Sequence, residues 1–383
     1  MKMKKVMLAA GARPNFMKIA AVMREMARYP HAFDPILVHT GQHYDIEMSD
    51  AFFNDLGLRK PDIHLGVGSG THGEQTGKIM IRFEKVCAEQ RPDLVIVVGD
   101  VNSTIACALV ASKLHIPAAH VEAGLRSFDR TMPEEINRVL TDQVCDYLFT
   151  TCEDANQNLI NEGIERERIH FVGNTMIDTL IRHIELARKS TILERLDLKD
   201  DRRTKKYAAV TLHRPSNVDH PDILRGILKA LNALAEEIPV ILPAHPRTTK
   251  QMKRFNLQGM VNHRERVSTS GSKARHRKIL VLPPLGYLDF LSLMSNATLV
   301  LTDSGGIQEE TTILGIPCLT LRKNTERPIT VTEGTNTVVG SDPEKILSTA
   351  LKALKQKAGK KKRPKYWDGK AAQRIVRILL DIL

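Results

Sequence analysis

The sequence has little of what marks disulfide-rich, metal-binding or membrane-spanning proteins. Its 383 residues include a single tryptophan and only 4% aromatic residues, and the five cysteines form no C-x-x-C pair. Scattered cysteines in odd number indicate buried thiols in a reducing compartment, not a disulfide framework or a zinc site. No apolar run approaches the roughly 20 residues that a membrane-spanning helix needs. We therefore expect a globular protein without a metal and without membrane insertion.

The chain carries a net charge of +12, which first suggests a nucleic-acid partner. The excess of basic residues lies in two loop-like segments, Arg264–Lys278 and Lys355–Lys365. No helix-turn-helix, RNA-binding signature or zinc knuckle accompanies them. The charge is therefore interpreted as a solvated surface, and we expect no nucleic-acid partner.

The first residues resemble the start of a signal peptide. Basic residues are followed by the apolar run Val6–Ala10, but Gly11 ends this run before it reaches the about 7–15 residues of a secretory core. The run is better interpreted as a buried first strand, and we expect a cytoplasmic protein.

Short apolar runs alternate with helical patterns along the whole chain. In the first half these runs are Val6–Ala10, Ile36–Thr40, Leu94–Gly99, Ala118–Glu122, Tyr147–Thr150 and Ile169–Gly173. In the second half they are Ala208–Leu212, Val240–Pro243, Ile279–Leu282, Thr298–Thr302, Cys318–Leu321 and Thr337–Val339. Continuous apolar strands are typical of a parallel sheet with both faces covered. The sequence thus predicts an α/β fold of two doubly wound, Rossmann-like domains, with ligands at the carboxyl ends of the strands.

Polar residues follow the predicted strands of the first half. Arg13 and Lys18 begin a helix after the first strand, which is typical either of an anion site or of an ordinary turn with solvated cations. Asp100 follows the third strand, Glu122 ends the fourth, and Glu134 comes twelve positions later. Carboxylates that lie close together, or close to a phosphate, have separated pKa values, so that one can act as an acid and another as a base.

In the second half, the segment Asp303–Glu310 carries the strongest signal. A buried strand breaks into Ser304–Gly306 and then opens a helix. Glycine amides at a helix N-terminus can hold a diphosphate, and Glu310 can reach the ribose hydroxyls. A tight loop with an N-cap would account for Ser304–Gly306 alone, but Glu310 and the following Thr325–Pro328 favour a phosphate site.

Taken together and in this order, the motifs resemble those of the non-hydrolysing UDP-N-acetylglucosamine 2-epimerases. They are Gly11–Pro14, Gly99–Asp100, His120–Arg126, Pro133–Arg138, Asp303–Glu310 and Thr325–Pro328. The similarity runs nearly end to end, and the stretches Thr71–Lys78 and Ser127–Asp142 look most like archaeal members.

The resemblance implies a fold of the glycosyltransferase-B type with its active site in the cleft between two domains. It implies a first domain over 1–177, a UDP-binding domain over 178–365, and a final helix at 366–383 that packs back onto the first domain. The implied reaction interconverts UDP-N-acetylglucosamine and UDP-N-acetylmannosamine without a cofactor. UDP leaves C1 as the C2 proton departs, giving 2-acetamidoglucal, and re-addition inverts C2. A homodimer that serves polysaccharide biosynthesis is implied as well.

The same resemblance assigns the residues of the site. The implied catalytic residues are Asp100, Glu122, Glu134 and His213. The implied substrate-binding residues are Arg13, Lys18, Leu285, Phe290, Ser304, Gly305, Gly306, Glu310 and Arg327. Cations of this set receive the negative charge of the departing diphosphate, while Phe290 and the backbone of Leu285 face the uracil. Which carboxylate removes the C2 proton and which returns it stays open.

Two other activities are compatible with parts of the pattern. Epimerases that act on UDP-2,3-diacetamido-2,3-dideoxyglucuronate share the segments His39–His43 and Met132–Glu135. A glycosyltransferase of the same fold is disfavoured by the three carboxylates.

The chain also departs from the family pattern. Many bacterial members bind a second UDP-sugar as an activator, and Gln42 and His245 resemble positions of that site. Asp45 stands in place of a further glutamine, which argues against activation by substrate. Ile329 replaces a glutamate that the family commonly has after Thr325–Pro328.

Overall fold

The chain forms two compact units. The computed structural model describes residues 3–41, 53, 57–199, 203–264, 278–355 and 362–383. Unit 1 contains Met1–Arg182 and Pro364–Leu383, and unit 2 contains His183–Arg363. The first change of unit falls within helix α7 (Thr175–Ala187), close to the predicted boundary at residue 177. The chain returns to unit 1 at Pro364, close to the predicted boundary at residue 365.

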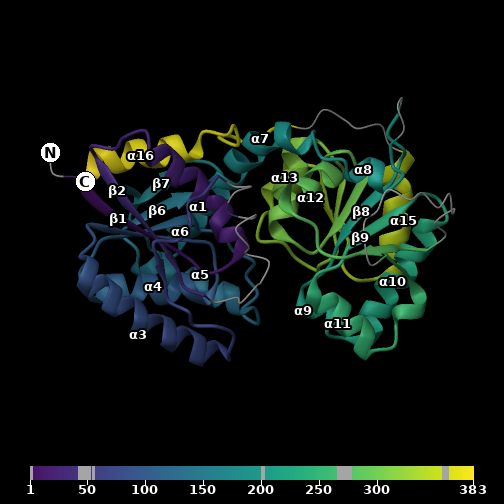
Figure 1. The fold of residues 1–383 in the computed structure, drawn as a ribbon, viewed down its shortest axis with the longest axis horizontal. Coiled ribbons are helices and arrows are strands. Elements are labelled where there is room, and N and C mark those ends of the chain that lie inside the picture. Colours follow the sequence, from purple (N-terminus) through teal and green to yellow (C-terminus); the bar gives the residue numbers. More distant parts are fainter. Residues whose placement is uncertain (1–2, 42–52, 54–56, 200–202, 265–277, 356–361) are drawn as a thin grey trace. The chain divides into compact units, whose positions relative to one another are not determined.

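Unit 1 is built on a parallel seven-stranded sheet with helices on both faces (Figure 1). In sheet order its strands are β3 (Ile63–His64), β2 (Phe33–His39), β1 (Lys4–Ala10), β4 (Leu94–Val98), β5 (Ala118–Ala123), β6 (Tyr147–Thr150) and β7 (Ile169–Phe171). Every residue of β4 and β5 is buried, as expected for strands covered on both sides. The order reverses between β1 and β4, which is where sheets of this kind bind ligands.

The helices of unit 1 form two layers. They are α1 (Arg13–Met26), α3 (His72–Gln90), α4 (Asn102–Lys113), α5 (Pro133–Val144), α6 (Glu153–Asn161), the first part of α7 and α16 (Ala371–Ile382), with a 3₁₀ turn at Arg166–Arg168. Helix α4 packs between α3 and α5, and α1 packs on α16.

The C-terminal segment is anchored in unit 1 by buried contacts. Trp367 is buried, and its indole Nε1 donates a hydrogen bond to the carbonyl of Thr151 at 2.9 Å. The carboxylate of Asp178 accepts hydrogen bonds from the backbone amides of Ala371 (3.1 Å) and Ala372 (2.7 Å). The negative side chain thereby satisfies the orphan amides at the start of α16.

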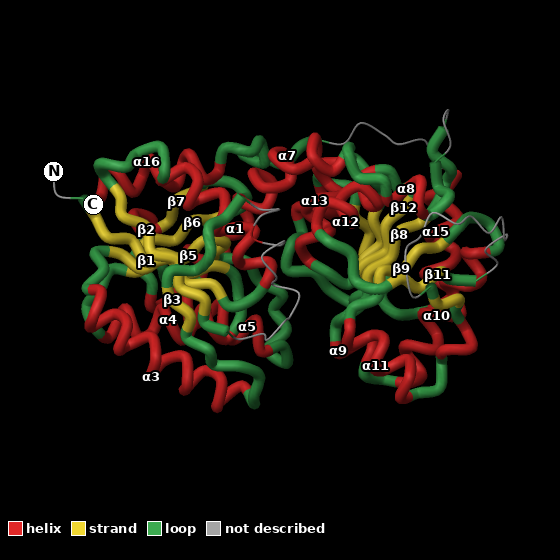
Figure 2. Tube along the Cα trace, viewed as in Figure 1, coloured by secondary structure: helices red, strands yellow, loops and turns green. Residues whose placement is uncertain are grey.

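Unit 2 has the same architecture, with a second parallel sheet of seven strands. Its strands are drawn in yellow in Figure 2. In sheet order its strands are β10 (Asn262–His263), β11 (Leu280–Leu282), β9 (Val240–Pro243), β8 (Ala208–Thr211), β12 (Leu299–Thr302), β13 (Cys318–Thr320) and β14 (Asn336–Val338). The helices are α8 (Ile192–Arg195), α9 (Pro215–Val218), α10 (Pro221–Ala235), α11 (Pro246–Arg254), α12 (Tyr287–Ser295), α13 (Gly305–Leu314), α14 (Ile329–Thr332) and α15 (Pro343–Lys355), with a 3₁₀ turn at Gln258–Met260. Here the strand order reverses between β8 and β12.

The predicted fold class is confirmed, and each of the twelve apolar runs overlaps a strand. The sequence missed β3 and β10, the strands at one edge of each sheet. Both are only two residues long, and the sequence Asn262-His263 is polar, so neither produces an apolar run. Within the part of the chain that the structure describes, every helix is too short or too polar to span a bilayer. Residues 265–277 and 356–361, most of the two basic segments, lie outside the described residues.

Candidate active site

The residues assigned from the sequence lie mostly after the carboxyl ends of the strands, at the reversal point of each sheet. In unit 1, Arg13 follows β1, and Asp100 follows β4. In unit 2, His213 follows β8, and the segment from Asp303 follows β12. Each unit thus presents polar side chains at the edge where a doubly wound sheet binds its ligand.

Glu122 occupies a distorted position in β5. The pairing of β5 with β6 shifts register between Val121 and Ala123, and Glu122 between them has a φ of +77°. A positive φ costs a residue with a β-carbon about 1–3 kcal/mol and persists only where its surroundings enforce it. The Glu122 carboxylate forms a buried ion pair with the ammonium of Lys18 on α1. The bulge therefore redirects a buried carboxylate toward a cation of the first helix, which offsets its charge.

Asp100 is held by Arg138 of α5. The Arg138 guanidinium contacts one carboxylate oxygen of Asp100 through Nη2 (2.7 Å) and Nε (3.1 Å). Its Nη1 pairs with Glu135, whose carboxylate also accepts hydrogen bonds from the backbone amides of Ser127 and Phe128. Arg138 is almost fully buried, while Asp100 remains partly exposed. Asp100 is thus fixed at its base and still accessible to a ligand.

Two further assigned residues lie at the same edge of unit 1. Glu134 is in the first turn of α5, one residue before Glu135, and is half-buried. Arg13 is the first residue of α1 and is also half-buried. Glu122 lies near Asp100, because a β-carbon placed on the adjacent Gly99 would be 3.5 Å from Glu122 Oε2.

In unit 2, Asp303 positions His213. The Asp303 carboxylate is fully buried and accepts hydrogen bonds from the backbone amides of His213 (3.0 Å) and Arg214 (2.9 Å). It also ion-pairs with His213 Nδ1 at 3.0 Å. Burial acts to raise the pKa of Asp303, but His213 and the amide donors hold it below its usual value. The His213 side chain itself is 37% exposed, so its ring is oriented from within and can meet a ligand.

The start of α13 has the form of an anion cradle. Ser304 is the N-cap in extended conformation, and Gly305 and Gly306 form the first turn, whose amides have no carbonyl partners within the helix. A β-carbon on Gly305 would lie 2.3 Å from Arg327 Nη1, so the close approach of Arg327 requires glycine there. Arg327 ion-pairs with Glu309 (2.6 Å) and Glu326 (2.7 Å). Arg327 is thus buried against the helix start, and its salt bridges fix the position of the cradle.

Glu310 is buried in the second turn of α13. Burial raises its pKa to about 8, and the hydroxyl of Tyr287 lies 3.2 Å from its Oε1. Tyr287 begins α12, the helix that also carries the half-buried Phe290, and Leu285 lies just before it. The residues assigned to the uracil and to the ribose therefore come from two helices that pack on each other.

The raised pKa of Glu310 predicts how the folding stability of the protein depends on pH. The folded protein keeps a proton on Glu310 that the unfolded chain loses between about pH 4.5 and pH 8. The stability of the parent should therefore fall as pH rises through this window, and this loss should be absent in Glu310→Gln. The measurement is thermal unfolding of both proteins across the window without ligand. Parallel curves for parent and variant would contradict a protonated Glu310.

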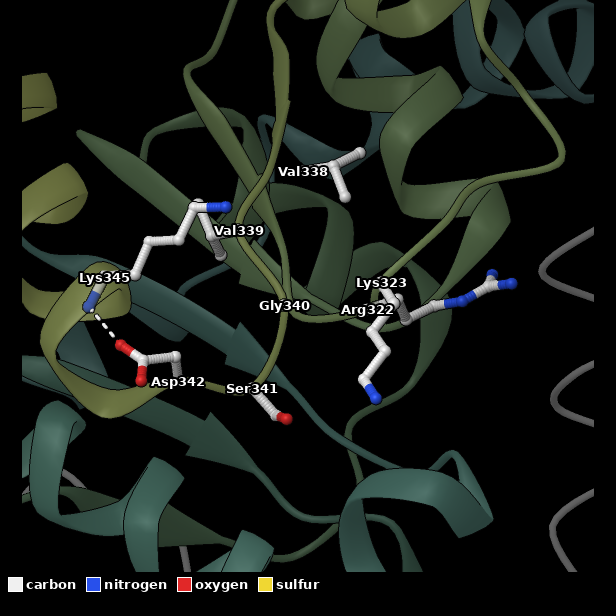
Figure 3. A pocket seen from close by; sticks show the side chains of 8 residues that line it. All are labelled: Arg322, Lys323, Val338, Val339, Gly340, Ser341, Asp342 and Lys345. Carbon is white, nitrogen blue, oxygen red and sulfur yellow. Dashed lines mark hydrogen bonds between the residues drawn. The ribbon is translucent and has the colours of Figure 1, made fainter.

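A surface hollow in unit 2 contains none of the assigned residues. It lies after β13 and β14 and is lined by Arg322, Lys323, Val338, Val339, Gly340, Ser341, Asp342 and Lys345 (Figure 3). The dashed line in Figure 3 is the hydrogen bond from the backbone amide of Lys345 to the Asp342 side chain, 2.8 Å, which caps α15. Arg322 of this hollow ion-pairs with Glu326 at 2.8 Å, the residue that also pairs with Arg327.

The residues assigned to an activator site are only partly described. Gln42 and Asp45 lie outside the described residues. His245 caps α11, its Nδ1 accepting a hydrogen bond from the amide of Arg247 at 3.1 Å, and its ring centroid is 5.7 Å from that of His213. Among the described residues, no three His, Cys, Asp or Glu side chains gather so as to hold a metal ion.

Comparison with known proteins identifies the family. The profile of the family described as UDP-N-acetylglucosamine 2-epimerase matches residues 24–380. The chain is 44% identical over 381 residues to the UDP-N-acetylglucosamine 2-epimerase of Methanocaldococcus jannaschii, covering 98% of each chain. The protein belongs to the UDP-N-acetylglucosamine 2-epimerase family. The resemblance inferred from the motifs is thereby confirmed, including its archaeal character.

Solved structures of the family share the fold. The crystal structure of the Methanocaldococcus jannaschii UDP-GlcNAc 2-epimerase in complex with UDP-GlcNAc and UDP matches with a TM-score of 0.87, covering 98% of this chain and 99% of that one. A second family relative, from Pseudomonas aeruginosa, is 40% identical over 381 residues, covers 99% of this chain and 100% of its own, and is named UDP-2,3-diacetamido-2,3-dideoxy-D-glucuronate 2-epimerase. Family members, epimerases and therefore isomerases, thus differ in the sugar that their names specify.

The sequence analysis assigned no role to three residues whose side chains contact and position assigned residues of the site. Arg138 and Asp303 stand inside matched motifs, but their partners Asp100 and His213 are 38 and 90 positions away, a pairing that no local pattern reveals. Tyr287 lies between Leu285 and Phe290, and its contact with Glu310 likewise depends on how α12 packs.

Proposed function

We propose that this protein is a UDP-N-acetylglucosamine 2-epimerase that interconverts UDP-N-acetylglucosamine and UDP-N-acetylmannosamine. The proposal rests on two groups of polar residues at the carboxyl ends of strands, one group in each unit. Unit 1 presents Glu122, Asp100 and Glu134 with the cation of Lys18. Unit 2 presents a glycine helix start for a diphosphate. A UDP-sugar whose C2 proton moves while its diphosphate departs needs both.

In the proposed reaction, the C1–O bond to UDP breaks and its electron pair leaves with the diphosphate. A carboxylate of unit 1 takes the C2 proton, and the C–H electrons form the C1–C2 double bond of 2-acetamidoglucal. In the second half, a carboxyl group returns a proton to the opposite face of C2, and the UDP oxygen bonds to C1 again. Overall, one stereocentre changes and no atom is lost.

The residues of this chain fit these steps. The α13 amides of Gly305 and Gly306, with Arg13, Lys18 and His213, would stabilise the charge that grows on the departing diphosphate. Asp100, Glu122 and Glu134 would move the proton at C2. Glu310 would bind the ribose, and Phe290 with the Leu285 backbone would face the uracil. The proposed Arg327 role is support of the diphosphate cradle, since it is buried beneath Gly305.

The proposal is tested by incubating the full chain with UDP-N-acetylglucosamine in deuterium oxide and following the sugars by NMR. We expect UDP-N-acetylmannosamine to form and deuterium to enter C2 of both UDP-sugars without any acceptor. Release of UDP without deuterium at C2 would instead indicate a glycosyltransferase. Absence of both products would contradict the proposed activity.

A second candidate substrate is favoured by one observation. The Pseudomonas aeruginosa relative at 40% identity is named for UDP-2,3-diacetamido-2,3-dideoxy-D-glucuronate. The same deuterium experiment with that uronate distinguishes the two activities. Faster turnover of the uronate would replace our first choice of substrate and leave the proposed chemistry at C2 unchanged.

We further propose a cytoplasmic homodimer that supplies a sugar for polysaccharide biosynthesis. The buried free cysteines suit a reducing compartment. Ile81, Phe128, Ile136 and Leu140 of unit 1 are exposed apolar side chains, and Ile136 and Leu140 lie one turn apart on α5, where a second copy would cover them. Light scattering on the eluted protein would measure the mass, and a monomer at micromolar concentration would contradict the dimer.

A further inference from the structure

A fully buried histidine lies directly behind the carboxylates of unit 1. His120 of β5 is 0% exposed. Its Nε2 is 2.8 Å from the carbonyl oxygen of Gly99, and its Nδ1 is 2.6 Å from Oδ1 of Asp142 on α5. A carbonyl oxygen only accepts, so Nε2 must carry a proton. A carboxylate also only accepts, so Nδ1 must carry one too if Asp142 is ionised.

The surroundings of Asp142 favour its ionised form. Its second oxygen accepts from the Arg126 guanidinium (2.7 Å) and from the amide of Gly124 (3.1 Å). Burial acts to raise the pKa of Asp142, but His120 and Arg126 hold it below its usual value. The nearby thiol of Cys145 is neutral, because burial and Asp142 raise its pKa well above the usual range. Asp142 therefore carries a negative charge.

Charge balance then requires a cation at His120. Arg126 is already paired through two nitrogens with Glu162, at 2.7 and 2.6 Å. Arg126 contacts Asp142 as well as Glu162, so one guanidinium faces two carboxylates. A neutral His120 would leave this row with an excess of negative charge, which is destabilising where it is buried. A protonated His120 makes the row Glu162, Arg126, Asp142, His120 neutral as a whole.

We propose that His120 donates from both ring nitrogens, to Asp142 and to the Gly99 carbonyl, and so positions the carboxylates of the proposed epimerase site. It does not touch the substrate, because its side chain is fully buried. Its Nε2 donates a hydrogen bond to the Gly99 carbonyl. Gly99 has a φ of +71° and forms the turn that leads to Asp100. His120 lies two residues before Glu122 on the same strand. The effect of this positioning on catalysis rests on the proposed function. The protonation of the ring can be tested without it.

Helix α5 links this buried row to the rest of the site. Asp142 lies four residues after Arg138, so both project from one side of the helix. Arg138 holds the Asp100 side chain, while Asp142, through His120, holds the backbone just before Asp100. Asp100 is thus fixed at two points by one helix.

The first test reads the ring directly. In full-length protein labelled with ¹⁵N-histidine, correlation of ring nitrogens with ring carbon-bound protons reports which nitrogens are protonated. At neutral pH we expect one histidine with both nitrogens protonated, assigned to His120 by its change in the Asp142→Asn variant. A neutral ring at that position overturns the proposal, whatever reaction the protein catalyses.

The second test removes the charge and so loosens the hold on Gly99. In Asp142→Asn, the amide can donate to Nδ1, so His120 becomes neutral and its charge-assisted bond to the Gly99 carbonyl weakens. We expect kcat to fall by at least about tenfold, since misplacement of a reacting group by roughly 1 Å can cost on the order of 100-fold. KM and the affinity for UDP, which unit 2 would bind, should change little.

The matched control is Asp146→Asn, the same chemical change at the other end of β5. Asp146 accepts a hydrogen bond from the amide of Ala118 at 2.8 Å, away from the strand end that carries Glu122, so this variant should keep kcat. An unchanged kcat in Asp142→Asn with a neutral ring would overturn the positioning role. A parent protein that converts no UDP-sugar would instead refute the proposed function while leaving the imidazolium testable by NMR.

Discussion

The Glu122→Gln variant is expected to lose epimerisation by about 100- to 10,000-fold in kcat, the usual contribution of a general acid or base. Glutamine keeps the size of the side chain but neither accepts nor returns a proton. The variant also leaves Lys18 as a buried cation without its partner, which should cost about 3–5 kcal/mol of folding free energy. Turnover is measured by NMR of the UDP-sugars, and stability by urea unfolding.

A double variant separates these two effects. In Lys18→Met/Glu122→Gln the buried pair is replaced by neutral side chains of similar size, so stability should return at least in part. The kcat of epimerisation should stay as low as in Glu122→Gln. Glu185→Gln, in an exposed pair with Arg188, serves as a control that should change neither property. Turnover that recovers together with stability in the double variant would show that the pair supports only the fold.

The Asp303→Ala variant should be the most damaging substitution in unit 2. It removes the acceptor for the amides of His213 and Arg214 and the partner of the His213 ring. Loss of one partner from a buried charged pair costs about 3–5 kcal/mol. With His213 no longer held, turnover should fall on the order of 100-fold. Urea unfolding and the epimerisation assay at a temperature where the variant is folded would measure both.

Two controls and a pH series refine this prediction. Asp303→Asn keeps an acceptor oxygen and should lose less stability, while Asp222→Ala, at a side chain that is 92% exposed, should lose almost none. The lowered pKa of Asp303 means that its contribution is present above the unfolded value of about 4 and is lost as pH falls through the folded value. The acid sensitivity of the parent should therefore be smaller in Asp303→Asn. Equal losses of stability in Asp303→Ala and Asp222→Ala would contradict the anchoring role.

The sheets could be predicted from the sequence because their central strands are buried on both faces. A run such as Leu94–Val98, short and apolar at every position, is typical of a strand covered on both sides. The edge strand Asn262–His263 could not be predicted, because two polar residues pair with β11 only where the tertiary fold brings them together. The same limit applies to the ends of helices, which fray over one or two residues.

The site was predictable as a set of residue types and not as a set of contacts. The order of the motifs along the chain predicted Asp100, Glu122 and Ser304–Gly306 as site residues. The positive φ of Glu122 depends on a mismatch between β5 and β6 that leaves no local trace, since glutamate is not a residue that favours that conformation. The close approach of Arg327 to Gly305 follows from packing alone, and its assignment to substrate binding stays a prediction.

The anchoring of Trp367 and α16 in unit 1 has a consequence for the order of events during synthesis. The ribosome finishes unit 2 before it makes Pro364–Leu383, so the later unit can complete its sheet and core first. Unit 1 remains incomplete while about 180 residues are added, on the order of 10–40 s at usual rates of synthesis. During that delay the surface that receives Trp367 is open to water and to chaperones. A nascent chain released before Pro364 would therefore carry a complete unit 2 beside a unit 1 that lacks its closing segment.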